Sequence, residues 1–158
     1  MCTRVHTSRR VRRAAIASGY MDTLSTEARS RLMSRIKGRD TKPELLVRST
    51  AHRLGLRFRL HDTRLPGKPD LVLPKHRTVI FVHGCFWHRH GCKLASNPKS
   101  RQDYWLPKFE RNVRRDAEHR ATLEAAGWRV VVIWECEAKA RDQLQARLIE
   151  LFGLQPLL

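Results

Sequence analysis

The sequence predicts a single α/β domain in which helices flank a mixed central β-sheet. A chain of 158 residues with 41% hydrophobic residues suits one domain with one sizeable core. Segments with helical periodicity alternate with segments rich in β-branched residues, in the order helix, three strands, long helix, strand and helix. A strand that reaches another strand through a long helix usually does so by a right-handed parallel connection. The sheet is therefore expected to contain both antiparallel and parallel strands.

Two helices are predicted ahead of the first strand. Ser25 offers a helix N-cap, apolar residues follow at helical spacing, and Gly38 ends this short first helix. Thr41 and Glu44 have the spacing of a capping box. This capping box predicts a second helix over residues 42–54.

Four extended segments follow. A long helix precedes the fourth segment, and a final helix follows it. Leu56 to Leu60 alternates apolar residues with arginine, as a half-buried strand does. Residues 70–73 and 78–82 flank a turn-like segment and predict a hairpin. Residues 128–134 form a continuous apolar, β-branched run, which predicts a fully buried strand. The remaining helical patterns cover residues 105–126 and 138–152.

Residues 1–22 are expected to form a basic, disordered arm ahead of the folded domain, which we place at residues 23–155. The arm is rich in arginine, alanine and serine and has no amphipathic pattern with apolar content. It either binds phosphate groups or is an upstream extension of the coding sequence, with Met21 as the natural start. Its arginines interrupt any apolar core, and no stretch reaches the roughly 18 uncharged apolar residues of a membrane span. Secretion and membrane insertion are not expected.

The charge balance points to a polyanionic partner. The chain has 32 Lys and Arg residues against 15 Asp and Glu residues, which gives a formal net charge of +17. Cationic side chains that neutralise phosphates release condensed counterions, and this release favours binding to nucleic acid. The competing interpretation is a solvated basic surface without a specific partner.

A cluster of cysteine and histidine residues predicts a structural zinc site. Cys85 and Cys92 bracket His88 and His90, and Cys136 follows the last predicted strand. Three of these thiols and one imidazole would complete a closed tetrahedral Cys₃His site that pins the loop to the sheet. His90 is our choice of ligand because it lies nearer the second cysteine, although spacing separates it only weakly from His88. The alternative is three buried apolar cysteines with solvent-facing histidines.

An acidic residue at the mouth of a strand is a candidate ligand for Mg²⁺. Asp70 ends the run Leu-Pro-Gly-Lys-Pro-Asp and opens the predicted strand over residues 70–73. Hydrolysis of a phosphodiester needs a divalent cation, and carboxylate oxygens are the ligands that Mg²⁺ prefers. Taken alone, an aspartate in this place is more often a turn or strand-end residue.

Four motifs together resemble one family of nucleases. A Pro-Asp pair at the start of a central strand resembles the PD-(D/E)xK superfamily, but Phe-Val-His-Gly stands where that motif has its second acidic residue and lysine. The runs at residues 66–70, 81–92 and 127–136, with Asn112-Val113 and Asp116, closely resemble the very short patch repair endonucleases. The likeness extends from about residue 25 to 152. It implies a restriction-endonuclease-like core.

The resemblance also implies an activity. Such an enzyme is a Mg²⁺-dependent, strand-specific endonuclease that nicks duplex DNA 5′ of the thymine in a T·G mismatch. These mismatches arise when 5-methylcytosine deaminates, and the nick starts their repair. The implied partners are mismatched double-stranded DNA, mismatch-repair proteins and a DNA polymerase that acts after the nick, in the bacterial cytoplasm. A monomer is expected, because nicking one strand needs one active site.

The same resemblance assigns the metal ligands. Asp70 would bind Mg²⁺, the backbone carbonyl of Val82 would complete the coordination, and Glu44 would orient metal-bound water. The family commonly has threonine at the position of Val82, a change that is tolerable if the carbonyl is the ligand. The capping box explains Glu44 fully without a catalytic role.

Proton transfer is assigned in the same way. His88 would act as general base or acid, and Asp116 would orient its ring, since an imidazole needs a partner on its other nitrogen. His83 is a second candidate for handling a proton or phosphate. The competing interpretations are a helix-surface charge for Asp116 and a strand-end polar residue for His83.

Two adjacent aromatic residues are candidate wedges for a base step. Phe86 and Trp87 lie between the first cysteine and His88, and two neighbouring large aromatics are awkward to bury together. Unstacking a mispaired step is less unfavourable than unstacking a paired one. The resemblance assigns these residues to intercalation from the major groove, and Met33 to insertion from the minor groove. By sequence alone, Met33 is more often a core methionine.

Two other functions compete with mismatch nicking. A restriction-type or generic PD-(D/E)xK nuclease would cut unmodified DNA, and the missing second acidic residue counts against it. A zinc-stabilised DNA-binding module without activity would use Asp70 and His88 only as structural residues.

Overall fold

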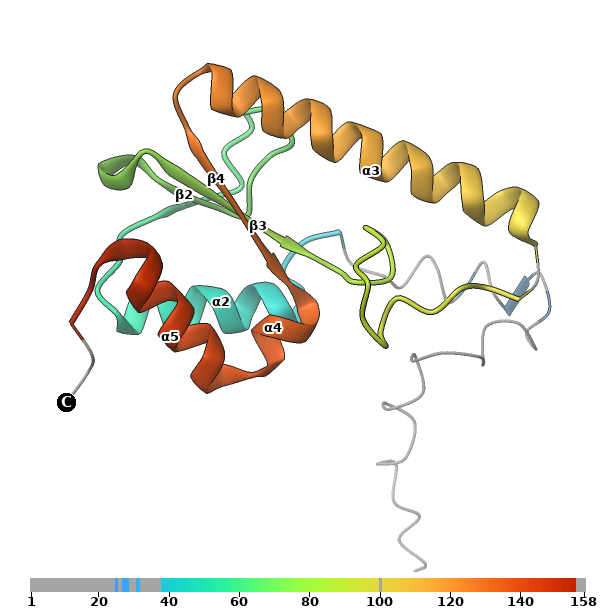
Figure 1. The fold of residues 1–158 in the computed structure, drawn as a ribbon, viewed down its shortest axis with the longest axis horizontal. Helices are drawn as coiled ribbons and strands as arrows, with labels where there is room; N and C mark the ends of the chain where they lie inside the picture. The colour runs from blue at the N-terminus through green and yellow to red at the C-terminus, as the bar shows by residue number, and fades with distance from the viewer. Residues whose placement is uncertain (1–24, 26, 29–30, 32–37, 100, 156–158) are drawn as a thin grey trace, which may run out of the picture.

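The computed structural model describes residues 38–99 and 101–155, together with Ser25, Glu27, Ala28 and Arg31 (Figure 1). The predicted arm over residues 1–22, most of the predicted first helix and the candidate wedge Met33 lie outside the described residues. Among the described residues, no helix has the length and apolar character that a membrane span requires.

The described chain forms a four-stranded mixed sheet with helices, which confirms the predicted fold class. The strands lie in the order β1-β2-β3-β4, with β1, β2 and β3 antiparallel and β3 parallel to β4. The crossover helix between β3 and β4 makes the parallel connection possible. The elements are α2 (Lys42–Arg53), β1 (Arg59–Leu60), β2 (Leu71–Leu73), the 3₁₀ turn η2 (Pro74–His76), β3 (Thr78–His83), α3 (Gln102–Ala125), β4 (Arg129–Trp134), α4 (Glu135–Lys139) and α5 (Arg141–Phe152).

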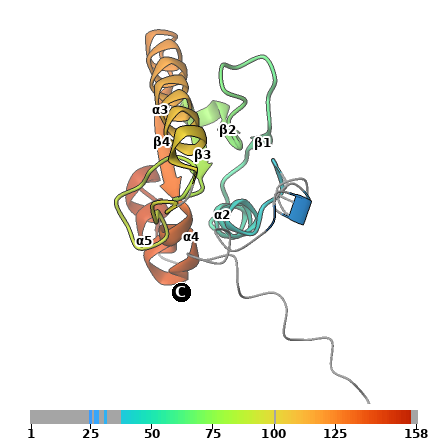
Figure 2. The ribbon, with the colours of Figure 1, turned by 90° about the vertical axis from the view of Figure 1, so that its right-hand side faces the viewer.

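The sheet separates two layers of helices. Helix α3 crosses one face, and α2, α4 and α5 cover the other (Figures 1 and 2). Side chains alternate between the layers, as strand geometry requires. Leu71 and Ile80 contribute to the core shared with α2 and α5, whereas Val72 and Val79 pack with Leu123 of α3. Both faces of the hairpin are therefore buried, and its strands have fixed register.

Three predicted elements differ from the structure. The strand expected over residues 56–60 pairs only at Arg59–Leu60, because Leu56 is drawn into the core next to α2. The strand over 128–134 is not fully buried, because β4 is the edge strand of the described sheet and Arg129 is exposed. The last predicted helix begins earlier, at Glu135, and breaks at Ala140, whose ψ of 82° is not helical.

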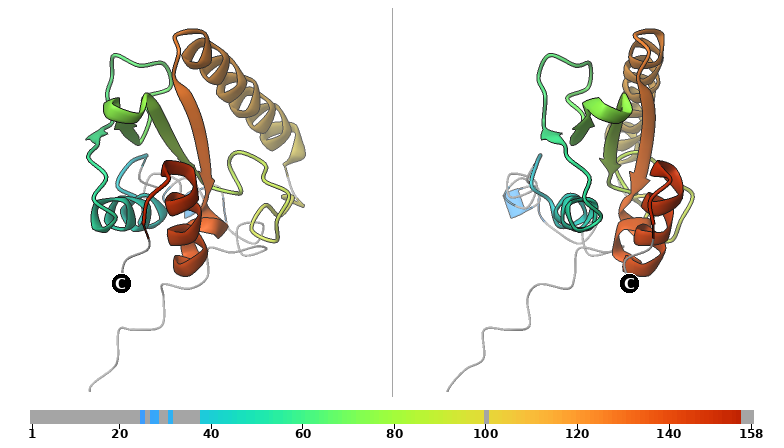
Figure 3. Two further views of the ribbon diagram at one scale, coloured as in Figure 1. Left: turned by 60° about the vertical axis from the view of Figure 1, so that its left-hand side comes forward. Right: turned by 90° about the vertical axis from the view of Figure 1, so that its left-hand side faces the viewer.

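The loop between β1 and β2 crosses the α3 face of the sheet before it delivers Asp70 to β2 (Figure 3). Gly67 lies in this loop at a φ of +73°, and a Cβ there would stand 2.7 Å from the Nδ1 atom of His119 on α3. Only glycine satisfies both the positive φ and the close approach of the helix. The glycine of the Pro-Gly-Lys-Pro-Asp run therefore lets the loop pack beneath α3.

Candidate active site and metal centre

Asp70 lies at the carboxyl end of β3, although it belongs to the start of β2. Its Oδ2 atom accepts a hydrogen bond from the backbone N–H of Val82 at 2.7 Å. Burial, with help from the negative charge of Glu44, raises the pKa of Asp70 to about 6, against the opposing effects of the hydrogen bond from Val82 and the charges of His61 and Arg48. A carboxylate that is buried against an acidic neighbour favours a bound cation.

Glu44 forms one half of the capping box that the sequence predicts: its backbone N–H donates to the Thr41 hydroxyl at 3.5 Å, but its carboxylate binds the backbone N–H of Asp40 instead of that of Thr41. It is 4% exposed, and its Oε1 atom accepts a hydrogen bond from the Thr41 hydroxyl at 2.8 Å. Its Oε2 atom accepts from the backbone N–H of Asp40 at 2.8 Å and from Arg48 at 3.0 Å. Both carboxylate oxygens of Glu44 are thus engaged within the protein, while its charge still acts on Asp70.

A histidine and an aspartate from distant parts of the chain meet beside β3. The Nδ1 atom of His88 is hydrogen-bonded to Asp116 of α3, so its Nε2 atom is the nitrogen that can serve a substrate. Burial works against ionisation of Asp116, but the hydrogen bond and charge of His88 hold its pKa below the usual value. The ring of His83 stacks on His88 with centroids 3.9 Å apart, and burial followed by the charge of His88 lowers the pKa of His83 to about 4.

The end of β3 brings these groups together. Val82 binds Asp70 through its backbone N–H, and the next residue, His83, stacks against His88. The buried carboxylate and the His88–Asp116 pair therefore flank one strand end. This arrangement can hold a cation next to an oriented imidazole.

Four ligand-type residues form a second cluster beside this site. One potential ligand atom from each of Cys85, His90, Cys92 and Cys136 lies within 4.8 Å of all the others. The Nδ1 atom of His90 is 3.6 Å from the sulfur of Cys85 and 3.4 Å from that of Cys136. His90, and not His88, is the histidine among these cysteines, and its ring stacks on Trp134. The cluster is compatible with a tetrahedral zinc site that joins the loop after β3 to α4.

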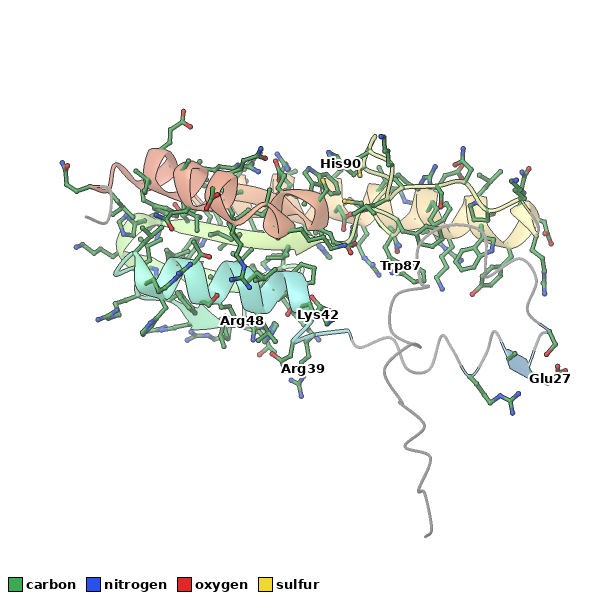
Figure 4. The ribbon with its side chains drawn as sticks, turned by 90° about the horizontal axis from the view of Figure 1, so that it is seen from below. Glu27, Arg39, Lys42, Arg48, Trp87 and His90 are labelled. Carbon is green, nitrogen blue, oxygen red and sulfur yellow. The ribbon has the colours of Figure 1, made fainter. Side chains whose placement is uncertain are left out.

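The two candidate wedges pack on helix α3 in this DNA-free structure. Phe86 makes edge contacts with Trp87, Trp105 and Phe109, and Trp87 also contacts Trp105. Phe86 and Trp87 are half-buried, whereas Trp105 and Phe109 are 2% and 3% exposed. Figure 4 shows Trp87 and His90 on the loop that runs alongside α3. The sequence analysis did not predict that Phe86 and Trp87 pack against Trp105 and Phe109, although these two residues lie four apart, on one face of the predicted helix.

Two further residues of the site were missed by sequence reasoning. Arg48 of α2 and His61 after β1 lie against the two carboxylates: Arg48 binds Glu44, and the Nδ1 atom of His61 is 3.8 Å from Asp70. The position of Arg48, four residues after Glu44, was a usable signal for an ion pair on one helix face. No periodic pattern marks His61, because it occupies the left-handed region with a φ of +46°.

Comparison with known proteins identifies the family. A sequence profile described as DNA mismatch endonuclease Vsr matches residues 21–94. The chain is 54% identical over 127 residues to the type II nicking enzyme V.XorIIP of Xanthomonas oryzae pv. oryzae, an alignment that covers 80% of this chain and 93% of that protein. It is 43% identical over 123 residues to the DNA mismatch endonuclease Vsr of Escherichia coli strain K12, covering 78% of this chain and 79% of that protein. The chain belongs to the Vsr family.

Membership of the Vsr family gives the site a chemical context. The type II nicking enzyme V.NmeAIP of Neisseria meningitidis serogroup A is also 45% identical to the chain, over 80% of the chain and 91% of that protein. The family supports a DNA-cleaving hydrolase with DNA as its substrate. A basic chain with a buried carboxylate and an oriented histidine suits this chemistry.

The raised pKa of Asp70 predicts a stabilising variant in the absence of divalent metal. An unfolded aspartate ionises near pH 4, but the folded carboxyl ionises at about pH 6. Folding therefore opposes ionisation of Asp70, and wild-type stability falls relative to Asp70→Asn as the pH rises from about 4 to about 6. At pH 8 in EDTA, Asp70→Asn should raise the free energy of unfolding by roughly 1–3 kcal/mol. Urea denaturation at pH 3.5 and pH 8 measures the difference, which should vanish at the lower pH; an equal difference at both pH values contradicts the raised pKa.

Proposed function

We propose that this Vsr-family protein is a Mg²⁺-dependent endonuclease that nicks one strand of duplex DNA 5′ of the thymine in a T·G mismatch. The nick would initiate very short patch repair of mismatches that arise from deamination of 5-methylcytosine, with mismatch-repair proteins and a polymerase acting afterwards. The observation that carries the proposal is the placement of Asp70 and the His88–Asp116 pair at the same end of β3. The E. coli relative named as a DNA mismatch endonuclease supports the choice of substrate.

Asp70 and the backbone carbonyl of Val82 would hold Mg²⁺. Oδ2 of Asp70 is bonded to the Val82 N–H, while Oδ1 is 3.8 Å from its neighbour His61 and remains available to a cation. The carbonyl is present whichever side chain position 82 carries, so valine is compatible with this ligand set. A bound Mg²⁺ supplies charge neutralisation at the phosphate and acidifies water. Glu44, fixed by hydrogen bonds from Thr41, the Asp40 amide and Arg48, would orient that water.

His88 would transfer the proton. Its Nδ1 atom faces Asp116, which holds the ring and its tautomer, so that Nε2 can accept a proton from the attacking water or donate one to the leaving oxygen. The lowered pKa of His83 keeps this second ring neutral at physiological pH. His83 would therefore support the position of His88 by stacking, or contact a phosphate as a neutral donor.

Phe86 and Trp87 would enter the mismatched base step from the major groove. Phe86 lies two residues before His88 and Trp87 lies one residue before it, so intercalation would place the scissile strand near the imidazole. Because both rings pack on α3 in the DNA-free structure, insertion requires them to exchange contacts with Trp105 and Phe109 for contacts with bases. Met33 is proposed to insert from the minor groove.

Zinc is the metal that we propose for the Cys85–His90–Cys92–Cys136 cluster. Three thiolates and one imidazole form a closed ligand set that leaves no open position, which suits a structural role. His88 lies two residues before His90, so a metal there would fix the loop that carries the proposed catalytic histidine.

The proposed activity is tested with labelled duplexes that carry T·G, T·A or C·G at the same position. Wild type should nick only the strand with the mismatched thymine, in Mg²⁺ and not in EDTA, and Asp70→Ala should lose at least about a hundredfold in rate. Equal cutting of all three duplexes would favour a generic nuclease. Binding without cutting would favour a zinc-stabilised DNA-binding module.

The same duplexes test the proposed wedges. The double variant Phe86→Ala/Trp87→Ala should lose mismatch discrimination, because each lost base–aromatic stack is worth about 1–3 kcal/mol. The matched control is Tyr104→Ala, which removes an exposed ring from the same aromatic group. Unchanged discrimination in the double variant would contradict intercalation.

The zinc proposal predicts that Cys136→Ser loses both metal and stability. Purified wild-type protein should contain about one zinc per chain by elemental analysis, and the variant should contain none and unfold several degrees lower. Cys2→Ser, at the cysteine that lies outside the described residues, is the control and should leave both properties unchanged. Native protein without bound metal would rule out the structural site.

A further inference from the structure

Arg48 occupies the centre of a group of residues that could otherwise hold a metal ion. Asp40, Glu44 and His61 present ligand atoms within 4.8 Å of one another. The Arg48 guanidinium contacts all three, with Nη1 at 2.5 Å from Asp40 Oδ1 and Nη2 at 3.0 Å from Glu44 Oε2 and 2.7 Å from His61 Nε2. Its side chain is only 11% exposed. The Arg48 guanidinium thus takes the place that a metal ion would occupy among these three residues. Figure 4 shows Arg48 on α2.

The contact with Arg48 determines the tautomer of His61. A guanidinium has five donors and no acceptor, so the Nε2 atom of His61 must accept the hydrogen bond. The ring proton of neutral His61 then resides on Nδ1, the nitrogen that faces Oδ1 of Asp70 at 3.8 Å. His61 also adopts a φ of +46° where the chain leaves β1 for the loop that delivers Asp70. The left-handed region is unfavourable for a residue with a side chain, so the contacts of the His61 ring must offset that strain.

The same guanidinium restrains Glu44. To reach a metal ion directly, Glu44 would have to give up the charge-assisted hydrogen bond from Arg48, together with those from Thr41 and the Asp40 amide. Charge-assisted hydrogen bonds in a buried site are among the stronger ones in proteins. Asp70 has no comparable restraint on its Oδ1 atom.

We propose that Arg48 is a positioning residue of the active site, which fixes Glu44 outside direct metal coordination and, through His61, braces the turn that leads to Asp70. The inference rests on the proposed Mg²⁺-dependent function. It assigns Arg48 two effects of opposite sign. The positive charge opposes binding of a divalent cation near Asp70, while the fixed geometry of Glu44 speeds the reaction once the cation is bound.

Arg48→Met separates these effects. Mn²⁺ binding to the full chain without DNA, followed by electron paramagnetic resonance, should tighten on the order of tenfold because one positive charge is removed from a buried site. Nicking of the T·G duplex at saturating metal should slow on the order of a hundredfold, because Glu44 loses its charge-assisted hydrogen bond and with it part of its fixed geometry. Arg48→Lys keeps the positive charge but lacks the planar guanidinium that contacts several partners at once, and it should bind Mn²⁺ within about twofold of wild type. Arg53→Met removes an exposed charge from the same helix and should change neither property.

Weaker or unchanged Mn²⁺ binding in a folded Arg48→Met variant would overturn the proposal, because a residue with a purely structural role lowers affinity and activity together. Circular dichroism establishes the folded state. A second measurement needs no variant: ¹⁵N spectra of the wild-type histidines at pH 8 should show His61 protonated on Nδ1 alone, and protonation on Nε2 would equally overturn it. Neither readout requires DNA cleavage, so failure of the proposed nicking activity is distinguishable from failure of this inference.

Discussion

The antiparallel pairing of β2 with β3, closed at one end by the hydrogen bond from the Val82 amide to Asp70, determines where every other group of the site lies. The pairing brings the start of one strand to the end of the next, so that a carboxylate from β2 meets the residues that follow β3. Both faces of the hairpin are buried, and a slip of one residue would move the core side chains to the wrong layer. The packing of two helical layers therefore fixes the strand pairing that places Asp70 beside the end of β3.

The loop after β3 is held at two places, on either side of His88. Before it, Phe86 packs edge-on against Trp105 of α3, and Trp87 packs against the same ring in a tilted arrangement. After it, His90 lies among the three clustered cysteines and stacks on Trp134 at the end of β4. With Asp116 bonded to its ring, His88 is oriented from three directions. An imidazole fixed in this way is pre-organised for proton transfer, and the aromatic contacts are the ones that DNA binding would exchange.

Features set by residues close together in the chain could be predicted from the sequence, but contacts between residues far apart in the chain could not. The Thr41 N-cap of α2 and the hairpin are set by neighbouring residues, so spacing predicted them correctly. The contact between His88 and Asp116 joins residues 28 positions apart, and only the family resemblance suggested it. The Arg48–His61 contact was missed because a left-handed turn has no periodic signature. Burial of the last strand was overestimated because composition does not show which strand lies at the edge of a sheet.

The central claim is that a divalent cation binds where Asp70 meets the end of β3. Paramagnetic broadening by substoichiometric Mn²⁺ in the ¹⁵N-labelled full chain tests it most directly, because the effect falls steeply with distance from the ion. We expect the amides of Asp70, Val82 and His83 to broaden first, and Asp70→Asn to abolish the effect. Broadening centred on Asp142 and Glu150 of α5, or broadening that persists unchanged in Asp70→Asn, would contradict it.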